Sequence, residues 1–323
     1  MTTATGPTVG IEALRAAARV LEGIAVRTPL VEVPALSSRA GVPVRLKCEQ
    51  LQPIGAFKIR GAYNAVARVA AEGRAAGVVT QSSGNHGQAV AYAGHAFGLR
   101  AVVVMPSSTP RIKVDGVRRH GGEVIFAGAT RSSEQLLRAE AIAAEEGLVM
   151  VPPYDHPDVI AGQGTVGLEI IEQCPEVDTI LSPVSGGGLI AGISVAVRAL
   201  RPSARLIGVE PAGAAKLSAA LAAGAPATLD RTSSMADGLL TRSVGSVTFP
   251  ILRRVVREAI QVSEDEIRAA VQFLYHEAGL TAEPSGAVGV AALLAGKVHA
   301  AGQVVIVLSG GNVDPELHAG LVG

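Results

Sequence analysis

The sequence contains no tryptophan, and aromatic residues make up only 3% of its 323 positions. Proteins that bind nucleic acids commonly stack bases on aromatic side chains and present a basic surface. Here 28 Lys and Arg residues are balanced by 28 Asp and Glu residues, so the formal net charge is zero. These absences argue against a nucleic-acid partner and against binding to an anionic membrane surface.

Cysteine is equally scarce, because the chain has only Cys48 and Cys174. Two distant cysteines do not make the framework of a disulfide-stabilised secreted domain, and they fit a reducing compartment. The first ten residues lack the basic and then apolar pattern of a secretory signal. The longest uncharged run lies between Asp178 and Arg198, and its proline and three consecutive glycines make it a poor membrane helix. We therefore expect a cytoplasmic protein without a membrane partner.

Apolar residues are abundant, at 48%, and they form short β-branched runs that alternate with alanine-rich helical stretches. Strands that are apolar throughout are buried on both faces, as in parallel sheets covered by helices. The predicted strands are Val44–Glu49, Gly77–Thr80, Ala101–Met105, Glu123–Phe126, Leu148–Val151, Thr179–Pro183, Leu206–Glu210, Ala259–Val262 and Val304–Leu308. The predicted helices are Ile59–Ala71, Gln88–Phe97, Gln135–Glu146, Ile160–Gln173, Ile190–Leu200, Asp265–Glu277 and Gly286–Ala295. This alternation predicts a doubly wound α/β fold.

One lysine is of interest because of the segment that contains it and the glycine-rich turns later in the chain. Lys58 lies in the segment Gly55-Ala56-Phe57-Lys58-Ile59-Arg60-Gly61-Ala62, directly before a predicted helix. Most lysines are solvated surface charges, so this segment alone proves nothing. A desolvated lysine, however, has a lowered pKa and can form a Schiff base with an aldehyde. An aldehyde cofactor that carries a phosphate would also need an anion cradle elsewhere in the chain.

A first glycine-rich turn, Ser82-Ser83-Gly84-Asn85-His86-Gly87, joins a predicted strand to a predicted helix. Unpaired amides at a helix start, together with Ser and Asn side chains, form a site that suits a carboxylate. Simple capping of the turn is the alternative for Ser-Gly-Asn alone. The whole motif is richer than capping requires, so we interpret it as a carboxylate site.

A second turn, Ser185-Gly186-Gly187-Gly188-Leu189, also stands between a strand and a helix. Three glycines allow backbone amides to close around an anion at a helix N-terminus. A dinucleotide site is the alternative, because the first and third glycines with Ala191 match the loose fingerprint and Glu210 ends the next strand. The turn alone leaves these two interpretations evenly matched. Nicotinamide chemistry, however, gives Lys58 no role.

A third turn, Ser309-Gly310-Gly311-Asn312, comes after the last predicted strand. In an open α/β sheet, ligands bind beyond the carboxyl ends of the strands. All three turns lie at such ends, and their convergence is a stronger signal than any one of them. We therefore predict that they contribute to a single site.

Together these segments resemble the fold-type II pyridoxal-phosphate enzymes, in the branch of threonine/serine dehydratases and serine racemases. The similarity extends from about Arg27 to Asn312, through Gly-Ala-Phe-Lys-Ile-Arg-Gly-Ala, Ser-Ser-Gly-Asn-His-Gly-Gln-Ala, Ser-Gly-Gly-Gly-Leu-Ile-Ala-Gly and Leu-Ser-Gly-Gly-Asn. The resemblance implies two open, twisted, mostly parallel sheets flanked by helices, similar to tryptophan synthase β. It also implies a large domain of residues 1–52 and 151–323, a small inserted domain of residues 53–150, and pyridoxal 5'-phosphate between them.

The resemblance also implies roles, residue by residue. Catalysis would fall to Lys58, as the Schiff-base lysine and proton carrier, and to Ser83, as a second base on the opposite face. The implied cofactor-binding residues are Phe57 and Lys58, Asn85 at the ring hydroxyl, Ser185, Gly186, Gly187, Gly188 and Leu189 around the phosphate, and Ser309 at the pyridine nitrogen. The implied substrate-binding residues are Ser82, Ser83, Gly84, Asn85 and His86.

Two positions depart from the family pattern. Ser185 stands where relatives often have a fourth glycine. The family's divalent-cation site usually draws on an acid after a Val-Glu-Pro strand and on a second acid shortly beyond it. Here Glu210 is present, but Lys216 occupies the second position. We therefore expect a salt bridge between Lys216 and Glu210, and no metal at this site.

Other polar residues are given no role in this interpretation. Glu283 matches a family segment near the cofactor ring, but an acid at a helix start explains it nearly as well. Asp237 matches the family without a role that we can derive. The basic cluster is interpreted as a solvated helix face, and it comprises Arg111, Lys113, Arg118 and Arg119.

The resemblance implies a lyase that converts a β-hydroxy amino acid, L-threonine or L-serine, to a 2-oxo acid and ammonia. Serine racemisation and dehydration of 3-hydroxyaspartate or phenylserine stay open as alternatives. A dicarboxylate substrate would need an extra cationic group, for which Arg131 and Arg242 are candidates. A nicotinamide-dependent oxidoreductase is the alternative from another class. The family also implies a homodimer or larger homo-oligomer.

Overall fold

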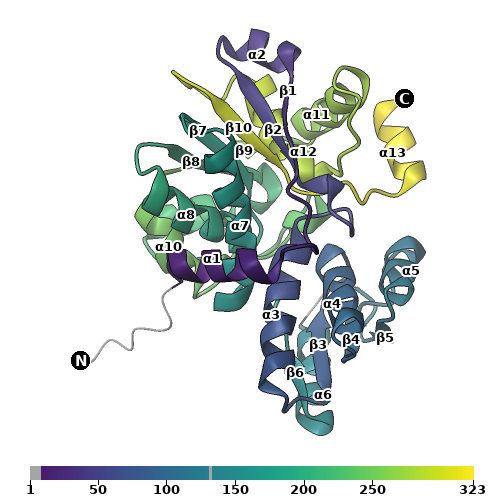
Figure 1. Ribbon diagram of the computed structural model, residues 1–323. Coiled ribbons are helices and arrows are strands. Elements are labelled where there is room, and N and C mark those ends of the chain that lie inside the picture. Colours follow the sequence, from purple (N-terminus) through teal and green to yellow (C-terminus); the bar gives the residue numbers. More distant parts are fainter. Residues whose placement is uncertain (1–8, 131–132) are drawn as a thin grey trace.

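A computed structural model describes residues 9–130 and 133–323 of the chain, and these residues form two β-sheets with helices on both faces (Figure 1). The larger sheet has six strands in the order β1-β2-β10-β7-β8-β9. Its strands are β1 (Leu30–Glu32), β2 (Val44–Cys48), β7 (Thr179–Pro183), β8 (Arg205–Pro211), β9 (Glu258–Val262) and β10 (Val304–Leu308). Only the edge pair β1–β2 is antiparallel, and all the other pairs are parallel.

The larger sheet is apolar on both faces because helices cover both. Along β10, Val305 and Val307 contribute to one core while Val304, Ile306 and Leu308 contribute to the other, as alternating side chains of a strand must. The first core is shared with α1 (Ile11–Val20), α7 (Pro157–Gln173), α8 (Gly188–Leu200) and α10 (Thr248–Val255). The second is shared with α2 (Pro34–Ala40), α11 (Glu264–His276), α12 (Pro284–Leu294) and α13 (Pro315–Val322). This burial explains the uninterrupted apolar runs of the sequence.

The smaller sheet has four parallel strands in the order β5-β4-β3-β6. They are β3 (Gly77–Gln81), β4 (Arg100–Met105), β5 (Glu123–Phe126) and β6 (Leu148–Met150). The helices that pack around it are α3 (Lys58–Glu72), α4 (Asn85–Ala96), α5 (Arg111–Arg119) and α6 (Glu134–Glu146). The predicted α/β class with two mostly parallel sheets is therefore confirmed, whereas the domain limits at residues 52/53 and 150/151 stay predictions.

Short elements complete the chain, and several were not predicted. The remaining helix is α9 (Lys216–Ala223), and the 3₁₀ turns are η1 (Glu49–Leu51), η2 (Ala212–Ala214) and η3 (Asp237–Leu239). The edge strand β1 was missed because three residues carry no periodic signal. Among the described residues, no helix has both the length and the apolarity needed to cross a bilayer.

Helix α3 packs against α4 beside the smaller sheet and against α7 beside the larger one, and it crosses α7 at a pair of glycines. A Cβ atom on Gly162 would lie 2.3 Å from the carbonyl oxygen of Arg60, and one on Gly61 would lie 2.7 Å from that of Val159. Real Cβ contacts are not that short, so only glycine allows the two backbones to approach this closely.

A buried cluster of charges fixes the first turn of α3. The guanidinium of Arg60 donates to both oxygens of Glu49, at 2.8 Å each, and to both oxygens of Glu169, at 2.6 and 2.9 Å. Lys47 donates to Glu169 at 2.5 Å and to the carbonyl of Thr28 at 2.7 Å. Burial disfavours the charged forms of Arg60 and Glu49, but their ion pairs outweigh it. The two carboxylates raise the pKa of Arg60, and Arg60 lowers the pKa of Glu49.

Candidate active site

The three glycine-rich turns meet in one cavity beyond the carboxyl ends of the strands, as predicted. Every residue that the family resemblance assigns to catalysis, cofactor or substrate lines this cavity: Phe57, Lys58, Ser82, Ser83, Gly84, Asn85, His86, Ser185, Gly186, Gly187, Gly188, Leu189 and Ser309. The first turn comes after β3 of the smaller sheet, whereas the other two come after β7 and β10 of the larger sheet. The cavity is thus built by both sheets.

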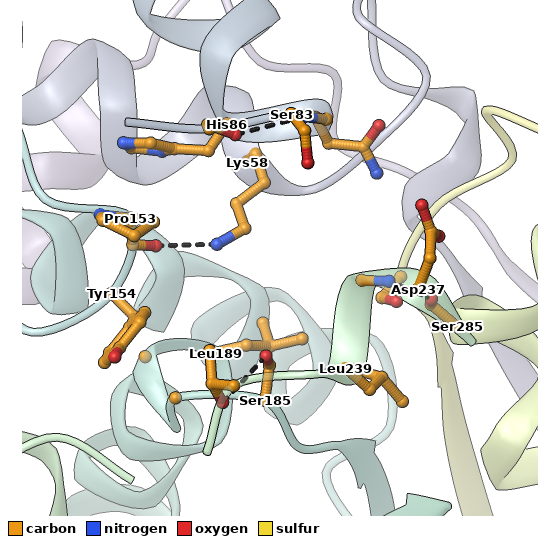
Figure 2. Close-up of a pocket in the computed structure, with 18 of the residues that line it drawn as sticks. Lys58, Ser83, His86, Pro153, Tyr154, Ser185, Leu189, Asp237, Leu239 and Ser285 are labelled. Atoms are coloured by element: carbon orange, nitrogen blue, oxygen red, sulfur yellow. Dashed lines mark hydrogen bonds between the residues drawn. The ribbon is translucent and has the colours of Figure 1, made fainter. Parts of the chain in front are cut away.

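Lys58 is the first residue of α3, and its side chain extends into the cavity (Figure 2). In this view it lies between the labelled Ser83 and His86 on one side and Ser185 and Leu189 on the other. Its Nζ atom donates to the carbonyl oxygen of Pro153 at 2.7 Å. Burial lowers the pKa of Lys58 from 10.5 to about 8, and the negative charge that Glu283 gains when it ionises opposes this shift more weakly. The amine is therefore a usable base and nucleophile near neutral pH.

The loop from Ser82 to His86 leads directly into α4. Helix α4 begins at Asn85, three residues before the predicted start, so the amides of the motif lie at a helix N-terminus. His86 Nε2 donates to the carbonyl of Val151 at 3.0 Å, while its buried Nδ1 makes no hydrogen bond within the described residues. Burial, with the positive charge of Lys58, lowers the pKa of His86 to about 3, so the ring is neutral. This geometry suits a carboxylate held by backbone amides.

Three side chains from distant parts of the sequence form a chain of hydrogen bonds at the edge of the cavity. Asn312 donates to Asn85 Oδ1 at 2.8 Å and to the carbonyl of Ile54 at 2.7 Å. Asn85 Nδ2 in turn donates to Glu283 Oε1 at 2.8 Å. Burial, and then the charge of Asp237, raises the pKa of Glu283 to about 8, so its carboxyl is protonated at neutral pH.

The triple-glycine turn has the close approach that a phosphate cradle needs. Gly187 has φ +96°, a left-handed conformation that favours glycine. A Cβ atom on Gly186 would lie 2.3 Å from the ring of Tyr154, and one on Gly188 would lie 3.0 Å from the Tyr154 backbone. The turn leads into α8, whose first amides have no partner within the helix. Unpaired backbone amides at this end of the cavity are therefore suited to bind an anion.

The rest of the donor set also fits pyridoxal phosphate. Ser185 lies with its hydroxyl 3.2 Å from that of Thr241, beside the glycine turn. Ser309 is 4% exposed at the end of β10, where its hydroxyl can meet a ring nitrogen, and its carbonyl accepts from the amide of Phe57 at 3.1 Å. One cavity therefore contains an amine for the aldehyde, a cradle for the phosphate and a neutral hydroxyl for the ring.

Sequence reasoning missed other residues of the cavity wall. Tyr154, Thr241, Ser285 and Lys113 line it. Glu283 and Asp237, which match the family but were given no role, line it too, and Asp237 of η3 forms an ion pair with Lys113 of α5. The prediction of a solvated helix face was wrong for Lys113, although Arg111, Arg118 and Arg119 are exposed. One signal was available: Lys113 is four residues before Val117, which is buried, so the two share a helix face.

The remaining predicted residues have different outcomes. Lys216 Nζ lies 3.6 Å from Glu210 Oε1, which confirms the expected salt bridge. Arg242 is exposed and donates to the carbonyl of Leu229 at 2.7 Å, and it does not line the cavity. Arg131 lies outside the described residues.

Comparison with known families decides which chemistry this cavity serves. The model of the family described as "Pyridoxal-phosphate dependent enzyme" matches residues 21–310. The chain belongs to this family. Its cofactor is pyridoxal 5'-phosphate, and the dinucleotide interpretation of the triple-glycine turn is set aside.

Relatives within the pyridoxal-phosphate family carry several activities. The chain is 41% identical over 307 residues to the L-threonine ammonia-lyase of Thermotoga maritima, covering 95% of this chain and 76% of that one. It is 39% identical over 313 residues to the L-threo-3-hydroxyaspartate ammonia-lyase of a Pseudomonas species, covering 96% and 97%. The structure of maize serine racemase matches with a TM-score of 0.93 at 37% identity, covering 96% of each chain.

Proposed function

We propose that this pyridoxal-phosphate enzyme is an ammonia-lyase that converts L-threonine or L-serine to a 2-oxo acid and ammonia. The observation that carries the proposal is the buried amine of Lys58, which shares one cavity with a helix start suited to a carboxylate and with a neutral hydroxyl, Ser309. Bound pyridoxal phosphate supplies electron withdrawal from the α-carbon of an amino acid. The similarity to a relative named L-threonine ammonia-lyase supports this choice.

The residues of the chain divide the remaining work. The amides at the start of α4, with Ser82, Ser83 and Asn85, would hold the substrate carboxylate and so fix the α-carbon. The Lys58 amine would take the α-proton, since a base with a pKa of about 8 is well matched to neutral pH. The substrate loses this proton and its β-hydroxyl as water. The resulting enamine takes up water and releases ammonia, leaving the 2-oxo acid.

Ser309 bears on the type of reaction. An aspartate at this position would hold a proton on the ring nitrogen and make the ring a strong electron sink. The neutral hydroxyl of Ser309 would not stabilise a protonated ring nitrogen in this way. A weaker sink favours loss of the β-hydroxyl coupled to removal of the α-proton over a long-lived carbanion.

Serine racemisation is the second candidate, and Ser83 is the observation that favours it. Racemisation needs one group to take the α-proton and another to return a proton on the opposite face. Ser83 lines the cavity together with Lys58, and a solved relative is named serine racemase. The hydroxyl of Ser83 would supply the proton that returns to the α-carbon on the opposite face.

The test is to incubate the holoenzyme separately with L-threonine, L-serine, threo-3-hydroxyaspartate and phenylserine. Release of 2-oxo acid and formation of D-amino acid are measured for each substrate. We expect 2-oxo acid from threonine or serine, abolished in Lys58→Ala and lowered but still measurable in Ser83→Ala, which loses one contact to the substrate carboxylate. Turnover of another substrate alone would overturn the choice of threonine or serine. D-serine formation that exceeds 2-oxo acid release and is lost in Ser83→Ala would establish the racemase instead.

A further inference from the structure

A second buried lysine lies behind the wall of the cavity. Lys216 begins α9, and its side chain has no exposed surface. Its Nζ atom donates to the carbonyl oxygens of Ala214, at 2.6 Å, and Leu239, at 2.8 Å, and lies 3.6 Å from Glu210 Oε1. Burying an ammonium group is costly unless its N–H donors find acceptors and its charge finds an opposite charge. Here three oxygens from three segments surround it.

The carboxylate of this pair is also fully buried and held from several sides. Glu210 accepts from the amide of Leu217 at 2.6 Å through Oε1, and from the amide and hydroxyl of Ser218 at 2.9 and 3.1 Å through Oε2. These amides belong to the first turn of α9, where a negative charge is favourable. The Glu210 side chain therefore joins the end of β8 to α9, and Lys216 joins both to a third segment.

That third segment is η3, which forms part of the cavity wall. Leu239, whose carbonyl Lys216 binds, lines the cavity together with Asp237 and Gly238. The amide of Gly238 donates to Ser285 Oγ at 2.9 Å, so η3 is held by Ser285 on one side and by Lys216 on the other. Lys216 thus reaches the substrate cavity through one hydrogen bond.

The oxygens around Lys216 are of the kind that bind Mg²⁺ or Ca²⁺, namely a carboxylate and two carbonyls. The family resemblance implies a divalent cation near Glu210, but the ammonium lies among these oxygens at hydrogen-bond distance. A metal ion on the same oxygens would stand next to a positive charge in a fully buried site. The residues present therefore do not fit the cation.

We propose that Lys216 is a built-in cation that replaces a bound metal ion and holds η3 in place as the wall of the substrate cavity. The chain would then keep its cavity formed whether or not divalent cations are present. Lys216 acts through η3, so it is a positioning residue and not a catalytic one.

Two substitutions test this proposal in the holoenzyme. Lys216→Met keeps the length of the side chain and removes the charge, whereas Lys216→Ser also opens the space between the oxygens. We expect both variants to lower the melting temperature and to raise KM about tenfold or more, with a smaller change in kcat. CaCl2, MgCl2 or KCl should restore the melting temperature and KM of Lys216→Ser only. Neither these salts nor a chelator should change the wild type at matched ionic strength.

Lys47 provides a matched control, because it is also fully buried and donates to three oxygens, those of the Thr28 carbonyl, the Glu169 carboxylate and the Gln173 side chain. It does not line the cavity. Lys47→Met should lower the melting temperature and change KM far less than Lys216→Met does. An equal rise in KM in Lys47→Met would show a general effect of instability and overturn the proposal. So would a wild type that binds Ca²⁺ or Mg²⁺ at Glu210, or Lys216→Ser without a response to any of the three salts.

The positioning role in KM rests on the proposed function, but the melting measurement does not. If threonine and serine are not substrates, the melting temperatures of Lys216→Ser with and without cations still decide whether the ammonium replaces a cation. A failure of the proposed function is thereby separated from a failure of this inference.

Discussion

Asn312 donates its side-chain amide to the side-chain oxygen of Asn85 at 2.8 Å, and this contact fixes which way the Asn85 amide faces. Because Oδ1 of Asn85 accepts from Asn312, Nδ2 of Asn85 faces Glu283 and donates to it. Asn312 is the last residue of the fourth motif, and no role for it could be assigned from the motif alone. The contact makes it an orienting residue for the cavity.

Removal of this contact should reduce activity without unfolding the chain. Asn312→Ala leaves the partly buried oxygen of Asn85 without its donor, which costs about 0.5–1.5 kcal/mol. We expect kcat/KM to fall about tenfold, the equivalent of ~1.4 kcal/mol. Asn64→Ala is the matched control, because Asn64 donates to the carbonyl of Asp158 at 2.8 Å outside the cavity. Equal kinetics in the two variants would contradict the orienting role.

The raised pKa of Glu283 predicts a pH dependence of stability. Its pKa is about 8 in the folded chain against 4.5 for an unperturbed carboxyl, so the folded state binds the proton more tightly. The stabilisation by this proton is fully present below pH ~4.5 and is lost as pH rises toward 8. Glu283→Gln, which keeps the shape without the titration, should remove this loss. Melting temperatures measured from pH 5 to 9 test this, and parallel curves for wild type and variant would refute it.

The contact of the triple-glycine turn with Tyr154 predicts a cofactor-binding defect that a second substitution relieves. A Cβ on Gly186 would lie 2.3 Å from the Tyr154 ring, so Gly186→Ala must displace either the ring or the turn. We expect at least a tenfold weaker affinity for pyridoxal phosphate, measured by titration of the apoenzyme. The double variant Gly186→Ala/Tyr154→Ala removes the collision and should recover part of the affinity. No recovery would show that the turn, and not the ring, limits the space.

The cluster around Arg60 predicts a large loss of stability. Arg60→Met would leave Glu49 buried and unpaired and would take from Glu169 one of its two cations, which should cost about 3–5 kcal/mol. The control is Arg100→Met, because Arg100 also bridges two carboxylates, Glu123 and Glu146, but is 42% exposed. Such surface pairs contribute about 0–1 kcal/mol. Similar unfolding free energies in urea for the two variants would contradict this ranking.

The fold could be predicted where burial leaves a direct pattern in the sequence. The strand Val304–Leu308 was predicted to the residue, because a strand buried on both faces is apolar at every position. The start of α4 was placed too late, because Ser, Gly and Asn favour turns and the helix begins within them. Strand β1 was missed, since antiparallel pairing at a sheet edge depends on β2 and not on the three residues themselves.

The parts of the site that lie within one sequence motif could be predicted. The contacts between residues from distant segments could not, because only the fold brings them together. Lys58 and residues of all three turns line the cavity, although the third turn contributes only Ser309. Asp237 and Lys113 are 124 residues apart, and no local pattern relates them. Their pairing results from the placement of α5 opposite η3, and the same holds for Tyr154 against Gly186.

The glycine crossing of α3 and α7 places the reactive amine close to a pivot. Lys58 precedes Gly61 by three residues, whereas the helix ends eleven residues after it, at Glu72. With a rise of about 1.5 Å per residue, the two ends lie roughly 4.5 and 16 Å from the crossing. Any rotation of α3 about this point therefore displaces its Glu72 end several times farther than it displaces Lys58. The reactive amine therefore lies on the short arm of the helix, where such a rotation moves it least.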